Sequence, residues 1–330
     1  MDSLMQHIVA LDDSESPLDM DGFRQWTKNL HAARNRSLQQ PTLFEGSEAL
    51  APIHVSAISY DGDPHRREPP AFARASGQHR LKLISRLGSA SARPQADGEA
   101  WLAQVDDTEQ KVIAKIFCPS FQIPEKPSVH DFEDVPRPRQ RARTEAQAYS
   151  SLSCYQGLWI PYFLGIYEIE LLHGETADMV LLEYVPGQSL FDWRRPHVLG
   201  NCEDHSESDP EITRLHNIHI EWLHKINRHV DAMYERGVQH GDLNGFNIIL
   251  TPGTEDIVII DFENARFEYL FKDRDVQKAV CGFVCCENHL TKLFDYCWDN
   301  GLPYEWWEWW PGLDRVVPLS STSADDTGPS

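Results

Sequence analysis

One stretch near residue 240 constrains the fold more than any other part of the chain. It reads His240-Gly241-Asp242-Leu243-Asn244-Gly245-Phe246-Asn247. Two short apolar segments follow it, Ile248–Leu250 and Ile257–Ile260, and Pro252-Gly253-Thr254 lies between them. Short apolar segments around a Pro-Gly turn predict the two strands of a hairpin. Pairing these strands would bring the carboxamide of Asn247 close to the carboxylate of Asp261.

Oxygen-bearing side chains at the ends of two strands suit a magnesium ion bound to a nucleotide. Mg²⁺ takes few ligands from the protein and the rest from phosphates and water. Asn247 and Asp261 are therefore the predicted metal ligands. Asp242, five residues before Asn247, is placed to accept a proton from an attacking hydroxyl group.

The pattern His-x-Asp-Leu-x-x-x-Asn, followed by a strand and Asp-Phe, resembles the catalytic and metal-binding loops of the protein-kinase-like superfamily. The resemblance extends over residues 81–311 and is greatest to the kinase-like proteins abundant in filamentous fungi. It implies an α+β, two-lobed protein-kinase-like fold, with a small antiparallel β-sheet lobe and a larger, mainly helical lobe. The implied division is an N-terminal extension (1–80), an N-lobe (81–183), a C-lobe (184–312) and a disordered tail (313–330). The extension is expected to be partly disordered, with a short helix near residues 23–33.

Short strands begin at Leu81. Three segments in series, 81–87, 100–105 and 111–117, predict an antiparallel meander with a tight turn at Asp106-Asp107-Thr108. The third holds Lys115 between apolar residues, where a charge is costly to bury unless it is paired. The resemblance to the Val-Ala-Ile-Lys strand of kinases implies that Lys115 binds the α- and β-phosphates of ATP and pairs with Glu145 in the next helix.

The predicted phosphate clamp departs from the kinase pattern. Between the first two strands the chain has Gly88 and then no further glycine until Gly98, so Gly-x-Gly-x-x-Gly is absent. The backbone around Gly88 and the hydroxyl groups of Ser89 and Ser91 are expected to cover the phosphates instead. The basic run from Arg137 to Arg143 is interpreted as the solvated start of a helix.

The segment that ends in Pro186-Gly187 resembles the connection between two kinase lobes. By this resemblance, backbone groups of Glu183 and Val185 would hydrogen-bond the adenine edge, and Leu182 would line the pocket behind it. The helical lobe would then include a long amphipathic helix that Gly237 ends. Its apolar positions repeat at steps of three and four residues: Ile220, Leu223, Ile226, Val230 and Met233.

Three departures concern regulation and substrate. Gly241 stands where many regulated protein kinases have arginine, so control by activation-loop phosphorylation is not expected. Glu263 replaces the glycine after Asp-Phe, and no proline occurs from 253 to 302, so the Ala-Pro-Glu element is missing. A helical run follows instead, and the tryptophan cluster 306–310 is expected to pack the end of the lobe, with an aromatic partner-docking patch as the alternative. Gly241, Glu263 and the missing Ala-Pro-Glu element together resemble the aminoglycoside and choline phosphotransferases, and the Glu263 carboxylate is a further candidate for the metal site.

Composition excludes several other classes of function. The 330 residues carry a formal net charge of −21, so phosphate backbones would repel the chain and we expect neither a nucleic-acid nor a membrane-surface partner. Seven cysteines without regular spacing indicate a reducing, intracellular setting. No apolar run approaches the ~18 residues of a membrane span. We therefore expect a soluble protein of the cytoplasm or nucleus.

The predicted function is ATP-dependent phosphate transfer with ATP and Mg²⁺ as cofactors. The acceptor would be a hydroxyl group, preferably of a protein Ser or Thr. A small-molecule kinase and a catalytically silent, kinase-like binding module are the alternatives.

Overall fold

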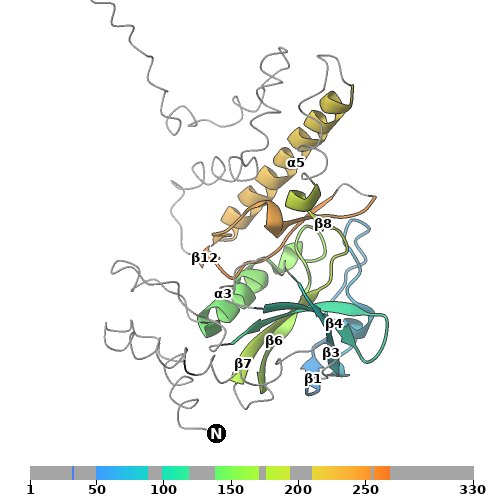
Figure 1. Ribbon diagram of the computed structural model, residues 1–330, viewed down its shortest axis with the longest axis vertical. Helices are drawn as coiled ribbons and strands as arrows, with labels where there is room; N and C mark the ends of the chain where they lie inside the picture. Colours follow the sequence, from blue (N-terminus) through green and yellow to red (C-terminus); the bar gives the residue numbers. More distant parts are fainter. Residues whose placement is uncertain are drawn as a thin grey trace, which may run out of the picture. The chain divides into compact units, whose positions relative to one another are not determined.

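The computed structural model describes residues 32, 50–87, 99–118, 138–170, 176–193, 210–253 and 256–267 (Figure 1). Outside these ranges lie Gly88, Ser89 and Ser91, the predicted helix near 23–33 apart from Ala32, the helical run after Glu263, the tryptophan cluster and the tail. The chain divides into two compact units, which are described separately. The first comprises Met1–Gly187, His240–Asp242 and Thr251–Arg266, and the second comprises Gln188–Gln239, Leu243–Leu250 and Phe267–Ser330.

A five-stranded antiparallel sheet dominates the first unit, with the order β3-β4-β5-β7-β6. Its strands are β3 (Leu81–Arg86), β4 (Glu99–Val105), β5 (Lys111–Phe117), β6 (Phe163–Glu170) and β7 (Thr176–Glu183). The predicted meander of the first three strands is confirmed. At the β4–β5 turn, Asp106 and Asp107 have positive φ angles of 51° and 56°, which tight hairpin turns require.

Alternation along β5 gives the sheet two different faces. Val112, Ala114 and Ile116 belong to one buried apolar cluster. The side chain of Lys115, between them in sequence, must point to the opposite face. Helix α3 (Pro138–Ser151) packs against β5, β6 and β7 (Figure 1). Its buried positions are Pro138, Ala142, Glu145, Ala148 and Tyr149. One acidic residue therefore lies within an otherwise apolar, buried stripe.

Residues 50–80 complete the apolar cluster. Strand β1 (Ile53–Val55) pairs antiparallel with β2 (Gly77–His79), and the 3-10 helix η1 (Ala71–Arg74) lies between them in the chain. Ile53, Val55 and Ala73 are buried in the same cluster as the sheet residues. The sequence analysis assigned no strand here, because three-residue strands are too short to produce a recognisable alternation.

The arginines at the start of α3 correct one interpretation. Arg139 forms an ion pair with Asp178 (3.0 Å), and Arg141 forms one with Glu263 (3.0 Å). Their side chains are only 13% and 12% exposed, so these two arginines are not a solvated helix start. Their acidic partners lie on β7 and after β11 (Ile257–Ile259). The sequence of the helix alone does not reveal such partners.

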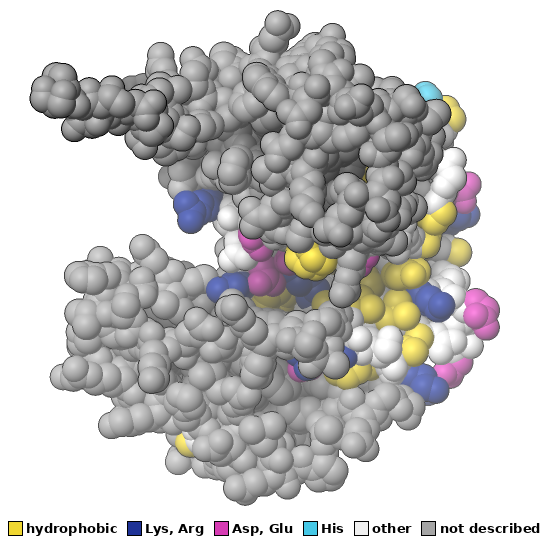
Figure 2. Space-filling model, turned by 45° about the horizontal axis from the view of Figure 1, so that its top comes forward, with side chains coloured by type: hydrophobic (Ala, Val, Ile, Leu, Met, Phe, Trp, Pro, Cys, Tyr) yellow, Lys and Arg dark blue, Asp and Glu magenta, His cyan; other side chains and the backbone are white. Residues whose placement is uncertain are grey.

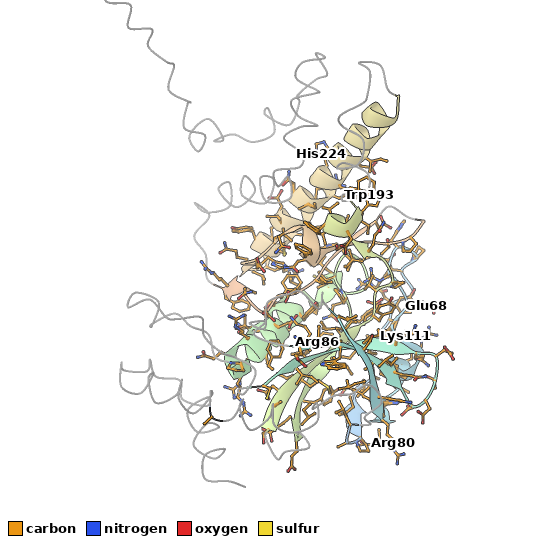
Figure 3. All side chains as sticks on the ribbon, in the orientation of Figure 1. Glu68, Arg80, Arg86, Lys111, Trp193 and His224 are labelled. Atoms are coloured by element: carbon orange, nitrogen blue, oxygen red, sulfur yellow. The ribbon has the colours of Figure 1, made fainter. Side chains whose placement is uncertain are left out.

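The second unit contains the long helix α5 (Pro210–Glu235). The predicted helix is confirmed, and Trp222, Ile226, Val230 and Met233 are buried. Trp193 is labelled in Figure 3. Its ring centroid lies 4.7 Å from that of Trp222. Strand β8 (Gln188–Ser189) pairs antiparallel with β10 (Ile248–Leu250).

The other short elements of the described residues are the 3-10 helices η2 (Ser153–Tyr155) and η3 (Gly245–Asn247) and the strands β9 (Val238–Gln239) and β12 (Arg266–Phe267). Within the described ranges, no helix has the length and apolar character needed to cross a bilayer.

Candidate active site

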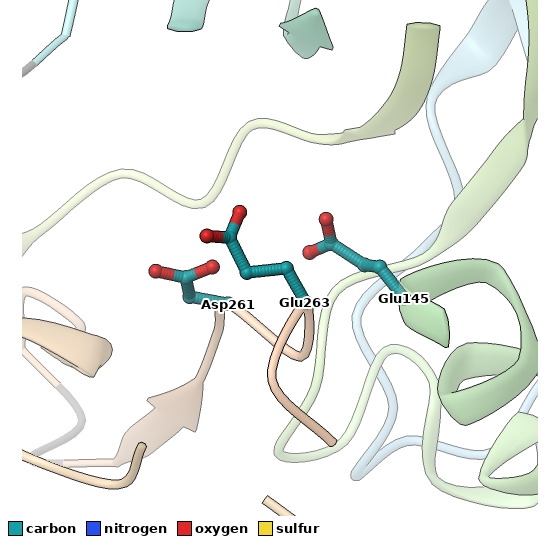
Figure 4. A group of neighbouring side chains, drawn as sticks. All are labelled: Glu145, Asp261 and Glu263. Carbon is teal, nitrogen blue, oxygen red and sulfur yellow. The ribbon is translucent and has the colours of Figure 1, made fainter. Parts of the chain in front are cut away.

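Lys115 is the centre of a cluster of charged side chains in the first unit. Its Nζ atom lies 2.7 Å from Glu145 Oε2, 2.6 Å from Asp261 Oδ1 and 3.1 Å from Glu263 Oε2. Glu145 comes from α3, and the other two acids come from the segment after β11. Figure 4 shows the three carboxylates directed into the same space. The Lys115–Glu145 pair is the one that the sequence analysis expected.

Mutual attraction fixes the ionisation of Lys115 and Asp261. Burial alone would lower the pKa of Lys115, but the neighbouring carboxylates raise this pKa well above its ordinary value. Burial also acts to raise the pKa of Asp261, but the charge and hydrogen bond of Lys115 hold that pKa below its ordinary value. Both groups are therefore charged at neutral pH.

Glu145 differs from the other two acids. Its carboxylate is fully buried, and burial raises its pKa to about 7, although Lys115 opposes this effect. Oε1 of Glu145 has no hydrogen-bond partner among the described residues. Lys115 and Arg141 supply two positive charges against three carboxylates, so a proton on Glu145 would balance the cluster. Figure 2 shows that basic and acidic side chains also lie next to one another on the described part of the surface of one face.

The raised pKa of Glu145 predicts a pH-dependent stability. At low pH the group is protonated in both states. As the pH rises from 4.5, the ordinary value, to about 7, the unfolded chain ionises first, so the free energy of unfolding falls. Glu145→Gln cannot ionise and should lose this decline. Urea denaturation of both proteins from pH 4.5 to 7.5 measures the difference, which should grow with pH by up to about 3 kcal/mol. Parallel curves would show that the pKa of Glu145 is not raised.

Arg141 gives the cluster its second positive charge. It donates from Nη1 to Glu263 Oε1 (3.0 Å), while Oε2 of the same carboxylate faces Lys115. The sequence analysis interpreted this arginine as part of a solvated helix start, although its spacing from Glu145 indicated a shared helix face. Arg141 precedes Glu145 by four residues, and residues at this spacing share one face of a helix.

The ring of His240 forms hydrogen bonds both to the predicted catalytic loop and to the segment that leads to Asp261. The backbone N–H of Asp242 donates to His240 Nδ1 (3.3 Å), so Nε2 carries the proton and donates to the carbonyl oxygen of Ile260 (2.8 Å). Burial lowers the pKa of His240, which agrees with a neutral ring. The ring also packs against Phe262, with a centroid distance of 4.7 Å. The exposed Asp242 is therefore two residues after a histidine that is held by two hydrogen bonds and a ring contact.

Gly241 lies where no side chain fits. Its φ angle is +79°, and an added Cβ would come within 1.9 Å of the backbone oxygen of Asn264. An arginine at this position would meet the same obstacle. The glycine is thus explained by close packing of two backbone segments.

Gly241→Ala is predicted to reduce the free energy of unfolding by about 2–4 kcal/mol, because the backbone must shift. Gly253→Ala is a matched control: its φ is also +79°, but nothing lies within 4 Å of the added Cβ. The control should lose about 1 kcal/mol. Chemical denaturation of both variants gives the comparison, and equal losses would argue against the Asn264 contact.

The backbone at Asp261 is unusual. Its φ angle is +71°, in the left-handed region that side chains rarely adopt, although Asp tolerates it better than most residues. Such conformations cluster at functional sites. The described non-glycine residues with positive φ are Asp106, Asp107 and Asp261. Glu263 is not among them, so its position does not require the conformational freedom of a glycine.

Comparison with known families bears on this part of the chain. The family model of the RIO domain matches residues 198–268. The RIO domain is a member of the protein-kinase-like superfamily. The resemblance to that superfamily is confirmed. The matched region includes α5, the loop from His240 to Asn247 and the acids Asp261 and Glu263. No curated protein matches the chain.

The three acids around Lys115 fit a magnesium ion by their chemistry. One ligand oxygen each from Glu145, Asp261 and Glu263 lies within 4.8 Å of the others, and hard cations prefer such oxygen ligands. Asn247 ends η3 in the second unit, where it is buried. The backbone N–H of Thr251 donates to the carbonyl oxygen of Asp256 (3.0 Å), as a hairpin turn requires. The pairing of Asn247 with Asp261 at a metal stays a prediction.

The residues predicted to hold adenine lie at and after the end of β7. Leu182 and Glu183 are buried, and Val185 is partly exposed. The backbone N–H of Glu183 donates to the carbonyl oxygen of Tyr162 (2.9 Å), so this N–H is not available to an adenine ring. The predicted adenine contacts themselves stay predictions, as do the phosphate contacts of Gly88, Ser89 and Ser91.

Proposed function

We propose that the protein is an ATP-dependent phosphotransferase of the protein-kinase-like superfamily. It would transfer the γ-phosphoryl group of Mg-ATP to a hydroxyl group, preferably of a protein Ser or Thr. The observation that carries this proposal is the buried Lys115, held between Glu145 of α3 and Asp261. The RIO match supports it, because members of that family are atypical kinases.

In the proposed reaction, each charged residue has one role. Lys115 orients the phosphates, and Glu145 fixes Lys115. Asp261 and Asn247 would hold Mg²⁺, which supplies charge stabilisation for the phosphates when bound. Asp242 positions the acceptor hydroxyl and takes its proton as the acceptor oxygen bonds to the γ-phosphorus. The bond from that phosphorus to the bridging oxygen breaks, and ADP leaves.

The proposal includes a two-lobed organisation. We assign residues 81–183 to an N-lobe and 184–312 to a larger, mainly helical C-lobe, with 1–80 as an extension and 313–330 as a tail. The antiparallel sheet with helix α3 packed against it supports the first assignment, and α5 supports the second. A cytoplasmic or nuclear location is part of the same proposal.

A small-molecule acceptor is the second candidate. The observation that favours it is Glu263, whose carboxylate lies against Lys115 and Arg141 where protein kinases have glycine. By the sequence resemblance, this substitution links the chain to the aminoglycoside and choline phosphotransferases.

The experiment that tests the proposal follows the γ-phosphate of labelled ATP. The purified full chain is incubated with Mg-ATP and either a Ser/Thr peptide library or a panel of aminoglycosides and amino alcohols. Label on peptides supports the first candidate, and label on small molecules supports the second. Transfer to neither, with wild type and Asp242→Ala alike in every assay, would favour the silent binding module and reject the enzyme.

A further inference from the structure

Arg67 and Glu183 form an ion pair in the first unit that shares no residue with the Lys115 cluster. Arg67 forms hydrogen bonds to both carboxylate oxygens of Glu183: Nε donates to Oε1 (2.9 Å) and Nη2 donates to Oε2 (3.1 Å). The Glu183 side chain is 9% exposed and that of Arg67 is 26% exposed. A fork of two parallel hydrogen bonds is among the strongest and most directional side-chain contacts.

The backbone around this pair is also engaged. Nη1 and Nη2 of Arg67 donate to the carbonyl oxygens of Leu158 (2.8 Å) and Ile160 (3.0 Å). The backbone N–H of Tyr162 donates to Glu183 Oε2 (3.0 Å), and the Tyr162 hydroxyl donates to the carbonyl oxygen of Arg67 (2.6 Å). The pair thus joins three segments that are distant in sequence. Breaking it would leave a nearly buried carboxylate without its cation.

The position of Glu183 in the chain connects the Arg67–Glu183 pair to the predicted nucleotide pocket. Glu183 is the last residue of β7 and pairs with Val112 of β5, three residues before Lys115. It is also the first residue of the segment 183–187, which contains Val185, whose backbone is expected from the sequence resemblance to hydrogen-bond the adenine edge. Arg67, 116 residues away in sequence, therefore holds the start of that segment.

We infer that Arg67 is a positioning residue for the nucleotide pocket, which acts by fixing Glu183. The inference rests on the proposed function. It adds that residues outside the kinase-like region, before Leu81, set the nucleotide affinity. Arg67 touches no reacting group, so its loss should weaken ATP binding rather than prevent transfer.

Arg66 provides a matched control. Its guanidinium donates to the carbonyl oxygens of Cys154 and Gln156, in the same neighbourhood that Arg67 contacts, and it pairs with Asp61 (3.6 Å). Arg66→Ala therefore loosens the same segment while leaving the fork on Glu183 intact. A general loss of docking would affect both variants alike.

The test compares the full-length wild type with Arg67→Ala, Arg67→Lys and Arg66→Ala. Hydrogen exchange of the peptide that contains 183–187 is measured without nucleotide, and the Kd for Mg-ATP is measured by calorimetry. Arg67→Ala should speed exchange and raise the Kd about tenfold, with Arg66→Ala near wild type. Arg67→Lys keeps the charge without the fork and should fall between them, which covers the case in which the alanine variant does not fold.

The two readouts separate the possible failures. Unchanged exchange in both Arg67 variants would overturn the positioning role, whatever happens to ATP. Faster exchange with an unchanged Kd would overturn the link to nucleotide binding. If the wild type binds no ATP, the proposed function fails and the link to the nucleotide fails with it, while the exchange data still decide whether Arg67 holds 183–187.

Discussion

Lys115→Met is expected to lower the free energy of unfolding by about 3–5 kcal/mol, the cost of removing one partner of a buried ion pair. Methionine keeps the length and apolar stem of the lysine. It leaves Glu145, Asp261 and Glu263 together with Arg141 as their remaining cation. Urea denaturation at pH 7 measures the loss, which should shrink at lower pH as the carboxylates become protonated.

Lys111→Met is the matched control for this variant. Lys111 lies on the same strand as Lys115, but it is exposed. A surface substitution of this kind usually changes stability by less than about 0.5 kcal/mol. Equal stabilities of the two variants would mean that Lys115 does not hold the three carboxylates together.

Asp242→Asn is expected to lower kcat about a thousandfold while the Kd for Mg-ATP stays within a few-fold of wild type. The carboxamide keeps the size of the carboxylate but cannot take the proton of the acceptor hydroxyl. The backbone N–H of residue 242 still bonds to His240, so the loop should stay in place. Steady-state transfer with a saturating acceptor, beside calorimetry with ATP, separates the two quantities.

Glu109→Gln, an exposed acid on the β4–β5 turn, should leave both quantities unchanged. A large rise in the Kd of Asp242→Asn would assign Asp242 to nucleotide binding instead. A variant that transfers phosphate as fast as wild type would remove Asp242 from the reaction.

Local patterns in the sequence were enough for the sheet and the central lysine. The order of β3, β4 and β5 followed from alternating apolar residues and the Asp-Asp turn, which are local signals. The buried lysine was visible because a charge within an apolar strand needs a partner. Glu145 followed from the family pattern and lies 2.7 Å from Lys115.

Contacts between distant segments were not predictable in the same way. Arg67 and Glu183 are 116 residues apart, and the sequence around each gives no local signal of a partner. The two arginines of α3 looked solvated because their acidic partners, Asp178 and Glu263, lie outside the helix. Tertiary packing decides such pairs, so a single sequence does not reveal them.

Gly241 illustrates the same limit. The sequence showed only that a regulatory arginine is missing. The structure adds the reason, because the carbonyl oxygen of Asn264 occupies the space that a side chain would need. A positive φ and a close backbone neighbour are not visible in the residue pattern.

The most direct test of the account is a thermal-shift titration of the wild type and Asp261→Asn with ATP, in the presence and absence of Mg²⁺. A ligand that binds only the folded protein stabilises it by about 2.7 kcal/mol at a hundredfold excess over Kd. The account predicts a Mg²⁺-dependent rise in Tm for the wild type, and loss of that rise in Asp261→Asn. No shift of the wild type at millimolar ATP, or an equal shift in both proteins, would contradict it.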